Sequence, residues 1–279
     1  MLLLLGCKKE SMTEPVVDTE RGLVQVMGGT FQMGSTSGSP LELPVHWVTL
    51  EGFYIDRTEI TYELWTEIRN WGLTHGYTDL PTGTNGYNPI GTNNPVTEVS
   101  WYDIVKWCNA RSEKQGLTPV YYTSNSLSTV CRTRQLDISA DAVKWTASGY
   151  RMPTEAEWEF AARGGTKSQG YKYSGSNSID SVAWWVLNSG NDTHPVSTRG
   201  ANELGMVDMS GNVWEWCWDW YDSYGTSAQA DPKGPVSGTS KLIRGGSCWS
   251  GWMNSTLTFR AYIGPSTSDS EVGFRCVRR

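Results

Sequence analysis

The chain has 279 residues and a formal net charge of −6. This length can hold one large domain or two small ones, and either would bury a substantial core. Because no basic cluster precedes the last few residues, we expect no nucleic-acid partner. The 30 glycines and 15 tryptophans favour a rigid, loop-rich domain over a helical bundle, with many of the tryptophans in its core.

The first residues have the order of a bacterial lipoprotein signal. Leucines at positions 2–5 and Gly6 precede Cys7, which would become the first mature residue and carry the lipid. A signal peptide has a longer apolar run and a basic start, so this interpretation requires a start upstream of residue 1. The alternative is a disordered tail with one stray cysteine. We expect a lipoprotein on the outer surface of a bacterial cell envelope, anchored to the membrane through Cys7, with residues 1–20 as signal remnant and polar tether.

The next segments have the patterns of short strands and a helix. Residues 23–35 alternate apolar and polar side chains around a Gly-Gly break, which predicts a hairpin, and residues 44–61 predict two further strands. Residues 60–71 carry apolar positions at helical spacing, and Thr61 is a suitable N-cap.

Two later segments carry helix-start signals. Ser100 precedes an apolar helical face, and Asp103 lies three residues further on, which is close to a capping box. Thr154 precedes Glu155 and Glu157, which place carboxylates in the positive first turn of a helix. Because residues two apart point to different helix faces, we interpret these glutamates as capping and ion-pairing residues and not as a catalytic pair.

Four motifs lie in the C-terminal half of the chain. They are GYRMPTEAEWEFAARGG at 149–165, DMSGNVWEWCWDWY at 208–221, LIRGGSCW at 242–249 and GFRCVRR at 273–279. Together they resemble the formylglycine-generating-enzyme (sulfatase-modifying-factor) family, a branch of the C-type lectin fold. The resemblance implies an α+β C-type lectin fold of that subtype, loop-rich with short strands and a few helices, as a single domain over 21–279.

In that family the stretch matching 208–221, which also reads as a central strand, supplies a structural calcium site. The resemblance implies Asn212, Val213 and Glu215 as its ligands here, because hard cations take side-chain and carbonyl oxygens. Val182 stands where a second family calcium site has an asparagine, so we expect that site to be lost. The sequence has no CxxC pattern and only three separated histidines, so we expect no zinc or iron centre and no required cofactor.

Catalytic members of the family carry two cysteines shortly after RGGS, which bind copper and oxidise a substrate cysteine. Here Cys248 follows RGGS at once, and the next cysteine is Cys276. A Cu(I) site needs two close thiolates, so the sequence predicts a protein that is not an enzyme. The RGGS and GFR motifs usually lie on neighbouring strands of this fold, so these two cysteines could form a disulfide. We expect Cys108 to be a buried helix cysteine.

Residues 249–271 have a composition typical of binding loops, rich in Ser, Thr, Asn, Asp and Tyr with interspersed Trp. The segment is similar to the variable regions of proteins diversified by a retroelement that mutates adenines, because most of its residues follow from asparagine codons. Trp249, Trp252 and Met253 do not follow from them, so the alternative for these three is a fixed scaffold role. The alternative is an ordinary polar surface loop. We predict a ligand-binding region over 245–275. Its large contact residues would be Trp249, Trp252, Met253 and Tyr262. Its polar contact residues would be Ser250, Asn254, Ser255, Thr256, Thr258, Ser266, Thr267, Ser268, Asp269 and Ser270.

The sequence therefore predicts a non-enzymatic, surface-displayed protein that binds an unknown ligand, with a protein favoured over a glycan. Two alternatives stay open. One is a structural envelope lipoprotein of the same fold, and the other is a formylglycine-generating oxidase in which Cys248 is a displaced copper ligand.

Overall fold

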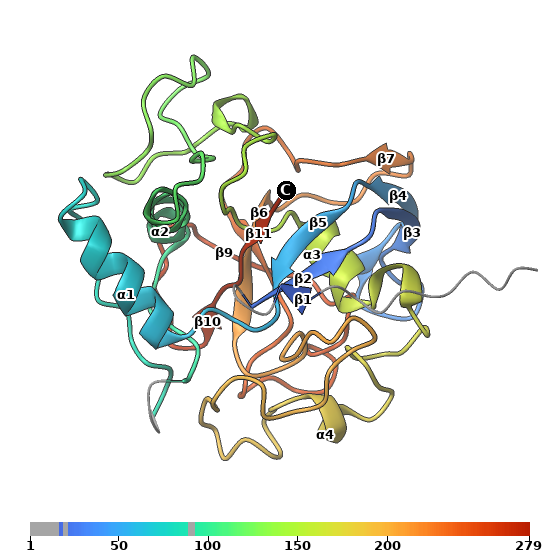
Figure 1. The fold of residues 1–279 in the computed structure, drawn as a ribbon. Coiled ribbons are helices and arrows are strands. Elements are labelled where there is room, and N and C mark those ends of the chain that lie inside the picture. Colours follow the sequence, from blue (N-terminus) through green and yellow to red (C-terminus); the bar gives the residue numbers. More distant parts are fainter. Residues whose placement is uncertain (1–16, 19–21, 89–92) are drawn as a thin grey trace, which may run out of the picture.

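A computed structural model describes residues 17–18, 22–88 and 93–279, and its short strands form three small sheets at the centre and one side of the molecule (Figure 1). The first sheet has the order β1-β2-β5-β11, the second β10-β6-β8-β9 and the third β3-β4-β7. The strands are β1 (Val17–Asp18), β2 (Leu23–Val26), β3 (Gly29–Met33), β4 (His46–Leu50), β5 (Phe53–Asp56), β6 (Trp214–Trp220), β7 (Gln229–Ala230), β8 (Lys241–Arg244), β9 (Ala261–Ile263), β10 (Val272–Gly273) and β11 (Val277–Arg278).

The hairpin predicted within 23–35 is wrong. β2 pairs with β5 and β3 pairs with β4, both antiparallel and in the same register, so the two segments form one long ribbon that bends at its glycines. A Cβ on Gly28 would lie 2.8 Å from the carbonyl oxygen of Leu50 and 2.9 Å from the amide nitrogen of Gly52. The Gly-Gly break is therefore a close crossing of two bent strands and not a turn. The two strands predicted within 44–61 are confirmed as β4 and β5.

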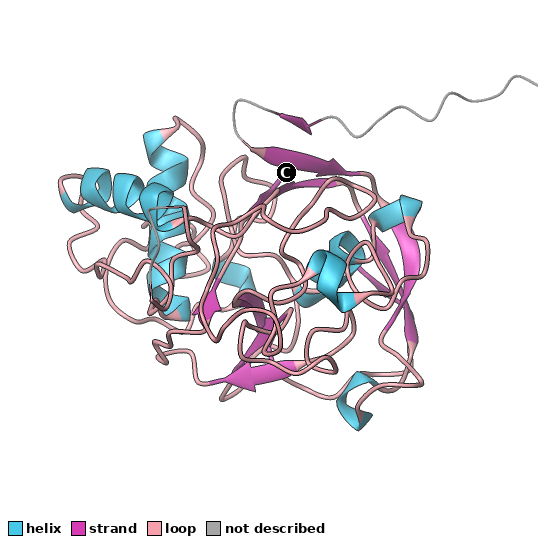
Figure 2. Ribbon diagram, turned by 90° about the horizontal axis from the view of Figure 1, so that it is seen from below, coloured by secondary structure: helices cyan, strands magenta, loops and turns pink. Residues whose placement is uncertain are grey.

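Three of the helices begin where the sequence predicts, namely α1 (Tyr62–Leu73), α2 (Trp101–Lys114) and α3 (Glu155–Ala162). The short α4 (Ile179–Val182) was not predicted, and 3-10 turns lie at Pro40–Glu42, Ala140–Ala142 and Gly165–Lys167. The Thr61 hydroxyl accepts a hydrogen bond from the Leu64 amide, and Ser100 and Thr154 each complete a capping box. Figure 1 shows α1 and α2 on one side of the sheets, and Figure 2 shows that loops form much of the rest. No helix in the described ranges is long and apolar enough to cross a membrane.

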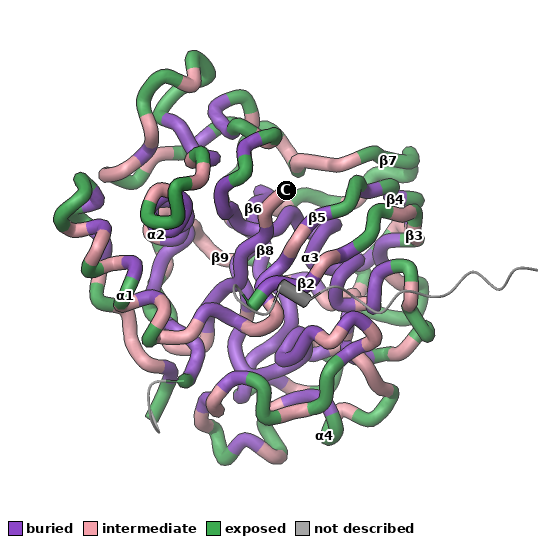
Figure 3. The backbone as a smooth tube through the Cα atoms, in the orientation of Figure 1, coloured by how far each residue is buried: buried purple, intermediate pink, exposed green. Residues whose placement is uncertain are grey.

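Two hydrophobic clusters hold these layers together. One joins α1 and α2 to β6, where Trp65 and Trp107 stack at a centroid distance of 5.6 Å. The other lies around α3, with Trp158 and Phe160 packed against the bent ribbon. Buried backbone therefore concentrates along the central strands, and the exposed segments are peripheral loops (Figure 3).

The structure tests the predictions for the N-terminal segment only in part. Cys7, the predicted lipid-bearing residue, lies outside the described residues. Within the predicted tether, Val17–Asp18 form β1 and pair antiparallel with β2, so these two residues belong to the first sheet. β6 has neighbours on both sides, parallel β10 and antiparallel β8, which confirms the central strand predicted within 208–221.

Candidate functional site

A buried arginine fixes the path of the segment 245–275 by hydrogen bonds to its backbone. Arg244, at the end of β8, is fully buried and donates to the carbonyl oxygens of Leu257, Thr258 and Phe259 at 2.9, 3.0 and 2.8 Å. The same guanidinium donates to a Glu159 carboxylate oxygen at 2.5 Å. Burial alone would raise the pKa of Glu159, but the guanidinium groups of Arg163 and Arg244 hold it below its usual value. One ion pair thus joins the segment to α3.

A second arginine ties the segment to α3 and to a loop far away in the sequence. Arg260 donates to both carboxylate oxygens of Glu155, at 2.6 and 2.9 Å, and to the carbonyl oxygen of Leu41 at 3.0 Å. The Thr258 hydroxyl donates to Glu42 at 2.6 Å. The return path of the segment is therefore fixed by buried polar contacts, while residues 249–256 project from it. Glu155 and Glu157 have separate arginine partners, as the sequence predicts.

Five of the predicted contact residues meet at one cavity of about 890 Å³, which we call the Trp252 cavity. They are Trp252, Met253, Asn254, Thr256 and Thr258. The loop 34–42, residues 170–172, Arg163 and Asn177 also line the cavity. The volume of the cavity is in the range of pockets that hold a small molecule or a protruding side chain.

Large apolar side chains stand at this cavity in contact with solvent. Trp252 is 47 % exposed and Met253 is 58 % exposed. The Lys172 ammonium lies 3.9 Å from the centroid of the Trp252 ring, which holds the ring in place by a cation–π contact. Exposed apolar groups beside a hollow are a recurrent feature of binding surfaces.

The other two large contact residues are exposed but lie outside the Trp252 cavity. Trp249 packs edge-on against Tyr87 at a centroid distance of 5.1 Å, and its indole nitrogen donates to the Asn191 carbonyl. Tyr262, on β9, stacks on Tyr221 at 4.0 Å. The four predicted large contact residues therefore lie on different parts of the surface, and only two of them line the Trp252 cavity.

Two of the predicted polar contacts face inward. The Ser250 hydroxyl accepts a hydrogen bond from the Ser247 amide at 2.9 Å, and Ser255 is fully buried against Gly246. Neither side chain can present itself to a ligand in this arrangement, so both support the loop. Ser266, Ser268 and Asp269 are exposed, and Thr267 and Ser270 are half-buried, but none of them lines the Trp252 cavity.

The residues that the resemblance implies for calcium do not fit that ion here. Both carboxylate oxygens of Glu215 accept hydrogen bonds from Arg275 at 2.7 Å. The Asn212 side-chain oxygen accepts from the His194 amide, and its nitrogen donates to Glu59. A calcium ion needs free oxygens, and the side-chain oxygens of Asn212 and Glu215 are taken by a backbone donor and by an ion pair.

The disulfide suggested for Cys248 and Cys276 is wrong. β6 separates β8 from β10, so the RGGS and GFR motifs are not on neighbouring strands. The Cys276 sulfur instead lies 3.6 Å from that of Cys108, a buried helix cysteine as predicted, and both are free thiols. Burial and the nearby Glu271 carboxylate together raise the pKa of the Cys248 thiol to about 12. In the absence of a metal, Cys248 is therefore a protonated thiol at neutral pH.

Sequence reasoning missed the residues outside 245–275 that line the Trp252 cavity. Glu42, Tyr171 and Lys172 contribute to the cavity although they lie far from residue 252 in the chain. No local motif marks them, because their role depends on the tertiary contact between three distant loops.

The chain belongs to the family described as "Sulfatase-modifying factor enzyme 1-like domain", which matches residues 8–279. It is 39% identical over 259 residues to "Chaperone protein LppX" of Paenibacillus barcinonensis, covering 85% of this chain and 80% of that protein. It is 31% identical to the formylglycine-generating enzyme of Streptomyces coelicolor, covering 92% of this chain and 88% of the enzyme.

Among solved structures, the chain is similar to Treponema denticola variable protein 1, with a TM-score of 0.77 and 32% identity, covering 92% of this chain and 94% of that one. The predicted α+β, C-type lectin fold of the formylglycine-generating-enzyme subtype is confirmed. The family includes enzymes, so membership alone does not decide activity.

Proposed function

We propose that the protein is a non-enzymatic binding protein of the bacterial cell surface, lipid-anchored through Cys7, which captures a ligand with a variable segment on a rigid frame. The ligand class we favour is a protein, with a glycan as the alternative. The observation that carries the proposal is the Trp252 cavity, where exposed large side chains stand on a segment fixed by Arg244 and Arg260. Loops on a rigid frame are where binding functions concentrate.

The cysteines support a binding function over an oxidase. Cys248 is fully buried with a raised thiol pKa, and Cys276 lies against Cys108. Copper oxidase chemistry needs a pair of accessible thiolates. If the purified protein bound Cu(I) and converted a cysteine peptide to an aldehyde, the non-enzymatic assignment would be overturned.

The similarity to a variable protein supports retroelement diversification, which the gene's surroundings can test. We expect a near-copy of the codons for residues 250–270 close to the gene, with adenines wherever the two differ, and a reverse-transcriptase gene nearby. Absence of both would leave a family-fold lipoprotein with a fixed surface.

The binding surface can be tested with a matched pair of variants. Alanine at Trp249, Trp252, Met253 and Tyr262 should abolish cross-linking to proteins of a surface extract while the melting temperature stays near that of wild type. The control replaces Trp47, 51 % exposed on β4, and Val236, 84 % exposed, which are not in the segment. If the control loses capture equally, or if the quadruple variant loses its fold, the four residues do not form a binding surface.

A second function is favoured by the relative named as a chaperone, which is 39% identical to this chain. A chaperone function of this chain would consist in binding unfolded polypeptides at its exposed apolar side chains. Suppression of the aggregation of reduced, denatured lysozyme by wild type, but not by the quadruple variant, would favour the chaperone function.

A further inference from the structure

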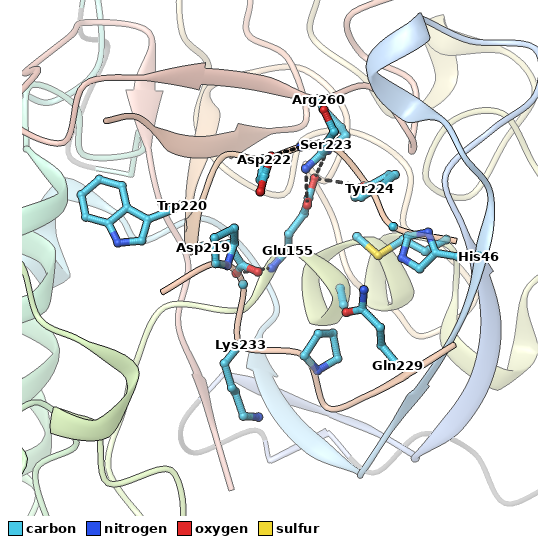
Figure 4. Close-up of a pocket in the computed structure, with 16 residues that line it drawn as sticks. His46, Glu155, Asp219, Trp220, Asp222, Ser223, Tyr224, Gln229, Lys233 and Arg260 are labelled. Atoms are coloured by element: carbon cyan, nitrogen blue, oxygen red, sulfur yellow. Dashed lines mark hydrogen bonds and ion pairs between the residues drawn. The ribbon is translucent and has the colours of Figure 1, made fainter. Parts of the chain in front are cut away.

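A second cavity, of about 320 Å³, lies apart from Trp252 between the start of α3, the end of β6 and the N-terminal end of β4 (Figure 4). We call it the His46 pocket. It includes His46, a residue to which the proposed function assigns no role. Asp219 and His46 line it at opposite sides in Figure 4, with Glu155 between them.

His46 offers the pocket a hydrogen-bond acceptor. The residue is only 4 % exposed, and its Nδ1 atom lies 3.0 Å from the carbonyl oxygen of Pro44. Because a carbonyl can only accept, this contact assigns the imidazole proton to Nδ1 and leaves the lone pair on Nε2. The ring packs against Tyr224 at a centroid distance of 4.7 Å, which fixes its orientation. No residue in the described ranges donates to Nε2.

Asp219 offers a second acceptor. It is 6 % exposed, and one of its oxygens accepts from the Glu155 amide at 2.8 Å. Its other oxygen accepts no hydrogen bond from the part of the chain that the structure describes. Burial and the Glu155 carboxylate together raise the pKa of Asp219 to about 7, against a lowering by the Lys241 ammonium. No cation donates a hydrogen bond to Asp219 in the part of the chain that the structure describes, so a ligand that supplies a cationic donor would stabilise the charged carboxylate.

The cations nearby are already engaged. Arg260 forms a bidentate pair with Glu155, and the Tyr224 hydroxyl donates to the same carboxylate. The Lys233 ammonium lies over the Trp145 ring at 4.4 Å. Lys241 donates to the Trp218 carbonyl and does not line the pocket. The lining therefore presents acceptors that its own cations do not use.

We propose that the His46 pocket binds a cationic hydrogen-bond donor, an alkylammonium or guanidinium group, with Asp219 and His46 Nε2 as its two acceptors. Such a group carries several N–H donors and a positive charge, which suit a carboxylate and an imidazole nitrogen as hydrogen-bond acceptors. The group can belong to a free amine or to a lysine or arginine side chain of a peptide. This inference is independent of the proposed function of the Trp252 cavity.

The test titrates the full chain with n-butylguanidinium and n-butylammonium, and with n-butylurea as a neutral analogue of the guanidinium. Imidazole NMR signals report binding, and the chain has only three histidines. We expect saturable shifts of the His46 Nε2 signal with the cations and none with the urea. Asp219→Asn should weaken binding about tenfold or more, because a charge-assisted contact is lost. His75→Gln, at an exposed histidine outside the pocket, should change nothing.

Several results would overturn the inference. They are equal shifts with n-butylurea, no His46 shift with either cation, or undiminished binding by Asp219→Asn. If Asp219→Asn does not fold, the comparison of charged and neutral probes on wild type still decides. Tighter binding of the peptide Gly-Arg-Gly than of n-butylguanidinium would identify a basic side chain as the source, and the reverse would identify a free amine.

Discussion

Replacing Arg244 by methionine should lower the free energy of unfolding by about 4 kcal/mol. The guanidinium is fully buried, and it donates to three consecutive carbonyl oxygens of 257–259 and to Glu159. Methionine fills a similar volume and removes every donor. Breaking a buried ion pair from one side costs roughly 3–5 kcal/mol, because the remaining charge stays buried. Glu159 keeps its ion pair with Arg163, which offsets the loss of the donor to the three carbonyl oxygens, so the middle of that range, about 4 kcal/mol, is expected.

Arg163 provides the matched control, because it pairs with the same Glu159 carboxylate at 2.8 Å but its side chain is 22% exposed. Arg163→Met should cost about 1 kcal/mol, since solvent screens a partly exposed charge. Urea unfolding followed by tryptophan fluorescence measures both variants. The reasoning fails if Arg244→Met lies within about 1 kcal/mol of wild type, or if the two variants are equally destabilised.

Three further results are expected. Oxidation should join Cys108 to Cys276, whose sulfurs lie 3.6 Å apart, and should raise the free energy of unfolding by on the order of 3 kcal/mol; mass mapping that finds a different pair would contradict this. Thr154→Ala should cost about 1 kcal/mol in urea, because it removes the acceptor of the Glu157 amide, and Thr154→Ser should restore most of it. Burial alone would raise the pKa of Glu157, but Arg151 outweighs it and lowers the pKa below the usual 4.5. That stabilisation is present above the unfolded-state pKa and lost as pH falls through the lower folded-state value, so Glu157→Gln should flatten the acid limb of a stability–pH curve.

Helix starts could be predicted from the sequence because each is a local event. A cap such as Ser100 or Thr154 bonds to an amide three residues away, and those residues stand together in the chain. The fold class could also be predicted, because each of the four family motifs is a continuous stretch of the sequence. Trp249, Trp252, Met253 and Tyr262 are exposed, and their use as ligand contacts stays a prediction.

Long-range contacts could not be predicted in this way. A glycine pair such as Gly28 and Gly29 looks the same in a turn and in the crossing of two bent strands, and only the neighbouring Gly52 distinguishes them. Glu215 reads as a possible metal ligand until Arg275 is placed beside it. Ser255 lies in a segment with the composition of a binding loop, but its side chain packs against Gly246. In each case the deciding partner lies elsewhere in the chain or depends on the tertiary path.

The contacts that fix the path of the segment and the side chains that it exposes can change independently, because only the first contribute strongly to folding. Arg244 and Arg260 fix the path of the segment through buried charges bonded to backbone carbonyls and to α3, and these contacts do not depend on which side chains project at 252–254. An exposed side chain contributes little to folding, so exchange at Trp252 or Met253 alters the Trp252 cavity at a cost near 0.5 kcal/mol or less. A buried position such as Ser255 lacks this freedom, since any larger side chain would meet Gly246. The segment therefore alternates positions that can vary with positions that cannot, and that alternation is what a binding surface open to change requires.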